Sequence, residues 1–138
     1  MDIWATSGQG DGLTTTLSCR QHTFIADEPL EAGGKDLGPS PFELLASSLA
    51  ACTSMTLRVY AAHKNINLGD FRVRVRVLRS CDPNTKASLL SLERDLFFSN
   101  KKPEELNKYK EIAEKCPIHM ALTGKVFIET RTFCEEKP

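Results

Sequence analysis

Two cysteines stand in settings that suit reversible thiol chemistry. Cys52 lies inside the apolar run of residues 44–55, which can shield a thiol from water. Cys116 directly precedes Pro117, where a new helix is expected to begin. The free amides and positive dipole end of that helix would stabilise a thiolate, and Lys115 adds positive charge nearby. A thiol pair far apart in sequence and close in a fold is what a redox cycle needs.

Each thiol also has a simpler interpretation. Cysteine is among the most buried residue types and often acts as a small hydrophobe. No cation lies one helical turn from Cys52, so an inert core cysteine stays open, and any activator must come from elsewhere in the fold or from a partner subunit. Cys116 can equally cap or pack without reacting. His119, close to it in sequence, could tune its thiol.

The remaining candidate ligands and nucleophiles form no recognisable site. Five cysteines is an odd number and no Cys-x-x-Cys occurs, so we expect neither a disulfide framework nor a four-cysteine zinc site. The three histidines show no metal-ligand spacing. Glycine-rich phosphate loops, Gly-x-Ser-x-Gly and His-Glu-x-x-His are absent. These absences remove the common nucleotide-binding, serine-hydrolase and zinc-protease interpretations. Three further cysteines are interpreted as incidental: Cys19, Cys81 and Cys134.

Composition is that of an ordinary globular protein. The 138 residues are expected to form one domain, 1–138, with 41% apolar and 26% charged residues. Basic and acidic residues balance at 18 each, which gives no support for nucleic acid or an anionic membrane as partner. We expect no secretory signal, because residues 1–6 lack a basic segment before an apolar stretch. No apolar run reaches the length of a membrane span. The cytoplasm, where thiols stay reduced, is the expected location.

One long helix is the best-defined element. Ser40, Pro41 and Glu43 form a capping box with proline in the first turn, and the helix should run to about Lys64. One face, spaced by three and four residues, is expected to carry Leu45, Leu49, Cys52, Thr56 and Val59. A helix this apolar should be central and largely buried.

Strands flank this helix on both sides in the sequence. We expect strands at residues 12–19 and 21–26 before it, and at 71–77, 89–98 and 125–133 after it. A second helix should start at Pro103 and end near Lys115, followed by a short helix that Gly124 ends. Because strands and helices are segregated, an α+β fold with an antiparallel sheet fits best. The alternating Arg72, Arg74 and Arg76 are expected to pair with Glu93 and Asp95 across the sheet.

Several motifs together resemble the OsmC/Ohr family of osmotically inducible and organic-hydroperoxide-resistance proteins. The resemblance runs from about His22 to the C-terminus, with the order of elements matching throughout. The motifs that carry it are Asp27-Glu28-Pro29, Gly33-Gly34, Gly38-Pro39-Ser40-Pro41-Phe42-Glu43-Leu44-Leu45, Ala50-Ala51-Cys52-Thr53-Ser54-Met55-Thr56-Leu57-Arg58 and Lys115-Cys116-Pro117-Ile118-His119.

The resemblance implies an OsmC-like fold in an interlocked homodimer, with paired central helices and active sites at the dimer interface. It implies a peroxidase that reduces organic hydroperoxides with two cysteines and no metal, flavin or haem. Cys52 matches the peroxidatic cysteine and Cys116 the resolving cysteine. A sulfenic acid on Cys52 would condense with Cys116 to a disulfide. A dithiol such as a lipoylated protein would then restore both thiols.

One supporting position departs from the family pattern. The family peroxidases also use an arginine near the N-terminus and a glutamate at the start of the central helix. Arg20 lies roughly where the arginine is expected. Counted back from Cys52, the glutamate falls on Phe42, and Glu43 is one residue away and already serves the capping box.

Three functions therefore follow from the sequence. The first is a thiol-dependent reductase of organic hydroperoxides in oxidative stress defence. The absence of the glutamate favours the second, a binding or redox-sensing domain that holds a small apolar or thiol-bearing ligand at the dimer interface without turnover. The third is a structural partner of another protein, with both cysteines inert.

Overall fold

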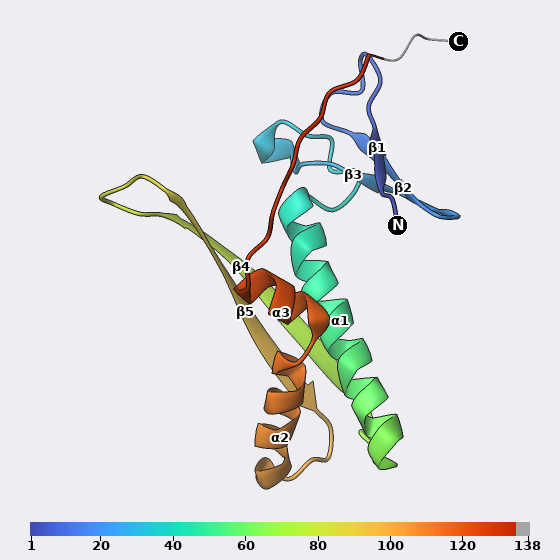
Figure 1. Cartoon of the computed structure of the whole chain (residues 1–138), viewed down its shortest axis with the longest axis vertical. Coiled ribbons are helices and arrows are strands. Elements are labelled where there is room, and N and C mark those ends of the chain that lie inside the picture. Colours follow the sequence, from blue (N-terminus) through green and yellow to red (C-terminus); the bar gives the residue numbers. More distant parts are fainter. Residues whose placement is uncertain (135–138) are drawn as a thin grey trace.

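The chain folds as three strands, a long helix, a two-stranded ribbon and two further helices (Figure 1). The structure is a computed structural model and describes residues 1–134. Segregation of strands and helices confirms the α+β class, with antiparallel sheets. The bounds are β1 Trp4–Thr6, β2 Thr15–Cys19, β3 His22–Ala26, a 3-10 turn Leu30–Ala32, α1 Pro41–Lys64, β4 Phe71–Cys81, β5 Ser88–Phe98, α2 Pro103–Glu114 and α3 Pro117–Thr123.

The strands form two separate antiparallel sheets. The order in the first is β1-β2-β3, and β4 and β5 form the second. The short strand β1 was not predicted, because three residues are too few for the alternation of apolar and polar side chains that identifies a strand. Figure 1 shows the first sheet beyond the N-terminal end of α1, whereas α1 lies along the ribbon.

One buried carboxylate joins the first sheet to the segment that leads into α1. Asp27, which follows β3, is 2% exposed. Its oxygens accept hydrogen bonds from the Thr14 hydroxyl at 3.0 Å and from the amides of Glu28 at 2.8 Å, Lys35 at 3.2 Å and Leu37 at 3.4 Å. Burial opposes its ionisation, but these donors outweigh burial and lower the pKa of the carboxyl group.

The capping box predicted for α1 is present. The Glu43 amide donates to the Ser40 Oγ at 3.4 Å, and the Ser40 amide donates to a Glu43 carboxylate oxygen at 2.8 Å. At the other end the chain leaves the helix through Asn65 in the left-handed conformation, with φ of 52°. Both predicted ends of this helix are confirmed.

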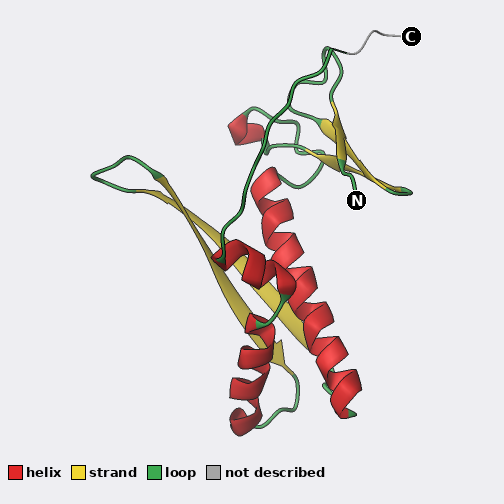
Figure 2. Cartoon of the chain, in the orientation of Figure 1, coloured by secondary structure: helices red, strands yellow, loops and turns green. Residues whose placement is uncertain are grey.

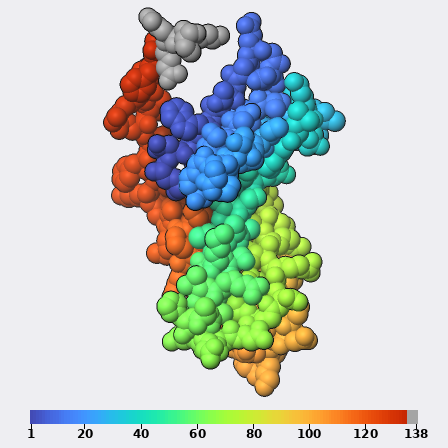
Figure 3. All heavy atoms as spheres, turned by 90° about the vertical axis from the view of Figure 1, so that its right-hand side faces the viewer, coloured from blue at the N-terminus to red at the C-terminus, as the bar shows by residue number. Residues whose placement is uncertain are grey.

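The buried face of α1 differs from the predicted one. Its buried residues are Ala46, Leu49, Thr53, Leu57 and Ala61. Cys52 and Thr56 lie at the edge of this stripe and Val59 is 58% exposed, so the prediction of a largely buried helix is wrong within one subunit. The reason is that β4, α2 and α3 cover only part of the helix. Figure 3 shows α1 running uncovered along one side of the molecule.

The uncovered side of α1 is apolar. Met55 and Val59 are 66% and 58% exposed, and Ala51 and Ala62 are exposed on the same side of the helix. These four residues, called here the open face of α1, follow spacings of three and four residues. An exposed apolar stripe on the longest helix indicates a contact surface.

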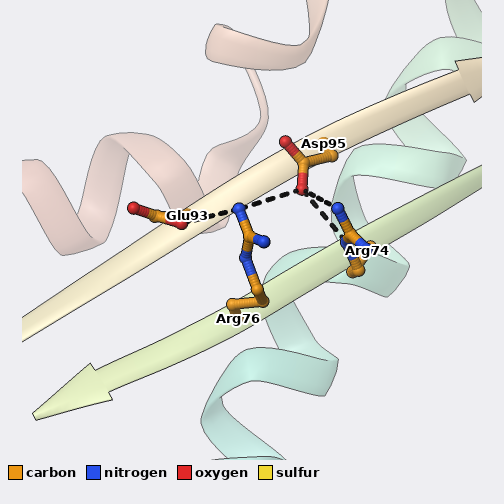
Figure 4. Close-up of polar contacts among 4 residues, drawn as sticks. All are labelled: Arg74, Arg76, Glu93 and Asp95. Carbon is orange, nitrogen blue, oxygen red and sulfur yellow. Dashed lines mark hydrogen bonds and ion pairs between the residues drawn. The ribbon is translucent and has the colours of Figure 1, made fainter.

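The predicted charge pairs across the ribbon are confirmed (Figure 4). Arg74 lies opposite Asp95 and Arg76 opposite Glu93 in the β4–β5 register. The ion pairs measure 2.9 Å for Arg74–Asp95 and 2.7 Å for Arg76–Glu93. All four side chains are on the solvent face, so each pair stabilises the ribbon by no more than about 1 kcal/mol.

A small core holds the C-terminal half of α1 against α2. Leu57, Ala61, Leu68, Tyr109 and Ile112 form one buried cluster. The Phe98 ring of β5 packs at the edge of this cluster, with its centroid 4.8 Å from that of Tyr109 and the two rings tilted by 36°. The cluster fixes α2, and through α2 the start of α3, relative to the helix that carries Cys52.

The last predicted strand, residues 125–133, does not form. The segment leaves α3 and runs without regular structure toward the end of the molecule that carries the first sheet (Figure 2). Val126, Phe127 and Ile128 are 65%, 89% and 88% exposed. A strand needs a neighbouring strand to pair with its backbone N–H and C=O groups. None of the strands described in residues 1–134 pairs with this segment.

Candidate active site

The first candidate nucleophile lies midway along α1. Cys52 is at the edge of the buried stripe, next to Thr53, and its side chain is half-buried. The Thr56 hydroxyl, one turn on, donates to the Cys52 carbonyl oxygen at 2.8 Å. A position at the boundary of the stripe lets a thiol reach both the interior and the outside of this subunit.

The second candidate is the N-cap of α3. Cys116 is fully buried, with no exposed surface, and its carbonyl accepts the first bond of the helix from the Met120 amide at 3.0 Å. Pro117 takes the first helical position, as the sequence predicted. The helix α3 that follows this cap packs against α1.

The structure brings the two thiols together. Cys52 and Cys116 lie close enough for each to shift the pKa of the other. Burial raises the pKa of the Cys52 thiol, and the neighbouring Cys116 raises it further. Burial also opposes ionisation of Cys116. Hydrogen bonds from Cys52, the His119 and Ile118 amides and Thr53 outweigh burial and lower the pKa of the Cys116 thiol.

Sequence reasoning missed one residue beside the thiols, Arg94 of β5. Its Nη1 donates to the Thr53 Oγ1 and to the Ala113 carbonyl oxygen, both at 3.0 Å. Its Nη2 lies 3.5 Å from the His119 Nδ1. Arg94 therefore contacts α1, α2 and α3 at once. Its partner Thr53 directly follows Cys52 in the sequence, and its partners Ala113 and His119 are each three residues from Cys116.

A signal in the sequence could have found this arginine. Glu93 and Asp95 pair outward with arginines of β4, and alternation along a strand then turns Arg94 to the inner face. Arg94 lies opposite Val75 in the register, on the face that covers α1. An arginine at an inward position of an alternating strand indicates a specific polar partner.

The two predicted supporting residues lie elsewhere in this subunit. Arg20 is exposed in the turn between β2 and β3, with φ of 55°. Glu43 bonds to Ser40 in the capping box. Phe42, at the position expected for the family glutamate, is covered by the Arg79 guanidinium, whose carbon is 4.3 Å from the ring centroid. Neither Arg20 nor Glu43 contributes to the thiol pKa shifts given above.

A mostly apolar groove of about 650 Å³ lies between β5 and α2. Leu49, Leu96 and Leu106 line it, and Arg94 and His119 form part of its wall. Within residues 1–134 no group of three His, Cys, Asp or Glu side chains could hold a metal ion. No helix in that range is long and apolar enough to cross a membrane. The chemistry that the contacts support is thiol chemistry: two sulfurs in contact can exchange a proton or form a disulfide.

The sequence matches the family described as OsmC-like protein over residues 33–131. No curated protein matches the chain.

Solved structures share the fold. The chain is similar to an organic hydroperoxide resistance protein OsmC from Legionella pneumophila, at 22% identity, 89% coverage of this chain, 88% of that chain and a TM-score of 0.70. An OsmC-like protein from Mycoplasma pneumoniae gives 24%, 89%, 86% and 0.68. The organic hydroperoxide resistance protein OhrB of Bacillus subtilis gives 22%, 89%, 90% and 0.68. At these identities the likeness shows the fold alone. Because the family match covers well over half of its residues, the chain belongs to the OsmC-like protein family.

Proposed function

We propose that the protein is a thiol-dependent peroxidase that reduces organic hydroperoxides. The observation that carries the proposal is the contact between a half-buried thiol, Cys52, and a fully buried one, Cys116. The half-buried Cys52 sulfur is accessible to a substrate, whereas the fully buried Cys116 sulfur is accessible only to Cys52 beside it. Structural neighbours named for organic hydroperoxide resistance support the choice of substrate class.

The proposed reaction uses the two sulfurs in turn. The Cys52 sulfur attacks the distal oxygen of the hydroperoxide and the O–O bond breaks. The alcohol leaves with the thiol proton, and Cys52 becomes a sulfenic acid. The Cys116 sulfur then attacks the Cys52 sulfur, which releases water and forms a disulfide. An external dithiol, such as a lipoylated protein, restores both thiols by exchange.

We infer that the working form is a homodimer. The open face of α1 and the exposed apolar residues 126–128 are the surfaces that a second copy would cover. In such a dimer an edge strand of the second copy could pair with the backbone of residues 125–133, which pairs with none of the described strands of its own subunit. A reducing compartment such as the cytoplasm suits the reduced resting thiols that the cycle requires.

Arg20 and Glu43 stay proposed as supporting residues. In one subunit Glu43 serves the helix cap and Arg20 is exposed in a turn, so either would have to act across the interface between copies. Arg20→Ala is then expected to slow oxidation of Cys52. Arg72→Ala, an exposed arginine on β4, is the control. Equal rates in both variants would remove Arg20 from the mechanism.

Mass spectrometry of non-reduced peptides tests the proposal directly. The protein is treated with cumene hydroperoxide or tert-butyl hydroperoxide and digested without reductant. We expect a peptide pair joined through Cys52 and Cys116 in stoichiometric yield. A Cys52 that stays a thiol under excess hydroperoxide would show the peroxidase assignment to be wrong.

A second function is favoured by one observation, the aromatic residue at the position of the family glutamate. Phe42 lies under Arg79, and Glu43 is engaged in the cap. A binding or redox-sensing domain that holds a small apolar ligand without turnover would need no acid there. Saturable binding of an apolar thiol, with no consumption of hydroperoxide by the reduced protein, would favour this function over the first.

A further inference from the structure

Arg94 of β5 carries a charge that no carboxylate in the described chain neutralises. Among residues 1–134 its polar partners are the Thr53 hydroxyl, the Ala113 carbonyl and the His119 imidazole, and no ion pair includes it. Arg74, by contrast, pairs with a carboxylate on the solvent face of the same ribbon. A partly buried guanidinium without an anion is costly, so this position favours an anion from outside the described chain.

The contacts of Arg94 leave one edge of its guanidinium available. Nη1 uses both of its hydrogens, on Thr53 Oγ1 and on the Ala113 carbonyl oxygen, each at 3.0 Å. Nε has no hydrogen-bond partner in the described part of the chain, and no buried side-chain nitrogen or oxygen there lacks a partner, so Nε is open to solvent. Nε and Nη2 together present two parallel N–H groups, the arrangement that matches the two oxygens of a carboxylate.

Arg94 forms part of the wall of the apolar groove between β5 and α2. The groove has a volume of about 650 Å³, and its apolar walls include Leu49 of α1, Leu96 of β5 and Leu106 of α2. A volume of this size is typical of small-molecule sites. Neither of the two thiols is among the residues that line it. The groove is therefore separate from the place where the two cysteines meet.

The other charged residues of the groove leave it positive. Asp95 also lines it, but its carboxylate pairs with Arg74 at 2.9 Å on the solvent face. The charges that remain are those of Arg94 and Lys110, against the exposed carboxylate of Glu114. An apolar groove with surplus positive charge is complementary to a ligand that is apolar along its length and anionic at one end.

A second copy of the chain would be the other occupant. Its exposed apolar residues 126–128 are followed by Glu129, which could in principle reach Arg94 across an interface. That carboxylate is already paired with Arg131 at 2.9 Å. A separate small anion therefore fits the groove better than this segment does.

We propose that this groove binds an amphipathic organic carboxylate, with the carboxylate on the open edge of Arg94 and the apolar chain between β5 and α2. Three hydrogen-bonding partners, one on each of α1, α2 and α3, hold the guanidinium in place before the ligand arrives. The site goes beyond the proposed peroxidase, because its lining contains no thiol and its ligand needs no peroxide bond.

Isothermal titration calorimetry with octanoate and octan-1-ol tests the site on the reduced protein without any hydroperoxide. Wild type is expected to bind octanoate at one site per subunit and the uncharged alcohol more weakly. Arg94→Met keeps an apolar side chain and removes the charge. It should weaken octanoate about 10- to 100-fold, because hydrogen bonds to an ionised group are lost, and leave the affinity for octan-1-ol unchanged.

The pair of ligands separates an anchoring role from a merely structural one, since a collapsed groove would lose both ligands equally. Arg74→Met removes an arginine from the solvent face of the ribbon and is expected to leave both affinities unchanged. Leu106→Trp, at an exposed position of α2, fills the groove with Arg94 intact and should weaken both ligands. Circular dichroism checks that each variant is folded, and Leu106→Trp gives an independent result if Arg94→Met does not fold.

Three results would overturn the proposal. They are equal affinity of wild type for octanoate and octan-1-ol, equal weakening of both ligands in folded Arg94→Met, and octanoate binding that appears only when Met55→Glu has made the protein monomeric. The last would show that a second copy fills the groove. A wild type that binds octanoate through Arg94 but consumes no hydroperoxide would keep this site and remove the peroxidase assignment.

Discussion

Cys52 and Cys116 lie close enough for each to shift the pKa of the other, and the one with the lowered pKa is the fully buried Cys116. The residue that can meet a substrate and the residue that most readily holds negative charge are therefore different. The two thiols titrate as a pair, because the charge on one sulfur changes the pKa of the other. Reactivity at this site should be a property of the pair.

The first prediction concerns the products of each single cysteine variant. Cys52→Ser is expected to abolish turnover of cumene hydroperoxide, because the half-buried sulfur is gone. Cys116→Ser is expected to convert Cys52 to sulfinic and sulfonic acids, because no partner sulfur remains to form the disulfide. Intact-mass spectrometry follows both. Cys81→Ser, at an exposed cysteine, is the control. Equal turnover in all three variants would contradict the two-cysteine mechanism.

The second prediction concerns alkylation of Cys52 by iodoacetamide as a function of pH. Burial raises the pKa of this thiol and Cys116 raises it further, so in wild type it should react slowly at neutral pH and faster as pH rises. Cys116→Ser removes the second contribution, and the alkylation midpoint of Cys52 should move to lower pH. Peptide mass spectrometry after timed labelling measures it. A midpoint that moves upward instead would show that Cys116 favours the Cys52 thiolate.

The third prediction concerns acid stability and Asp27. The folded state lowers the pKa of this carboxyl group below its ordinary value of 3.8. Its contribution to stability is therefore complete above that ordinary value and is lost as pH falls through the lower folded-state value. Asp27→Asn should lower the thermal midpoint at neutral pH and flatten its fall in acid. Scanning calorimetry measures both, with the exposed Glu31→Gln as control. Parallel acid curves for wild type and Asp27→Asn would refute this role.

The fourth prediction concerns the open face of α1. Met55→Glu puts a carboxylate in the middle of this surface, where a second copy would bury it unpaired. Self-association should weaken on the order of 100-fold or more, because burial of an unpaired charge costs several kcal/mol. Light scattering coupled to size-exclusion chromatography measures the mass. Leu106→Glu, at an exposed position on α2, should leave the mass unchanged. A wild-type protein that is monomeric at all concentrations would rule out the dimer.

Local signals in the sequence were enough to place most elements. The capping box at Ser40 and Glu43 defined the start of α1, and strict alternation defined β4 with its charge pairs to β5. Both depend on residues close in sequence or directly opposite in one ribbon. Such contacts leave a pattern that a single chain displays.

Contacts between distant elements were not predictable in the same way. The predicted buried stripe of α1 included Val59, whereas the structure buries Leu57, because the positions of β4 and α2 decide which apolar residues are covered. Residues 125–133 were predicted as a strand, but none of the strands described in residues 1–134 pairs with them. The only sign of Arg94 in the sequence is a charged residue at an inward position of the alternating strand β5. Its partners could not be predicted because they come from three different helices.

The uncovered residues 126–128 have a consequence for how the protein behaves on dilution. Three large apolar side chains lie in a row on a segment without regular structure, and none of the strands described in residues 1–134 pairs with it. Such a stretch is a template for edge-to-edge pairing. If a second copy covers it, the melting temperature will rise with protein concentration. In dilute solution the dimer would dissociate and leave the same stretch exposed, and the melting temperature would fall to that of the free subunit.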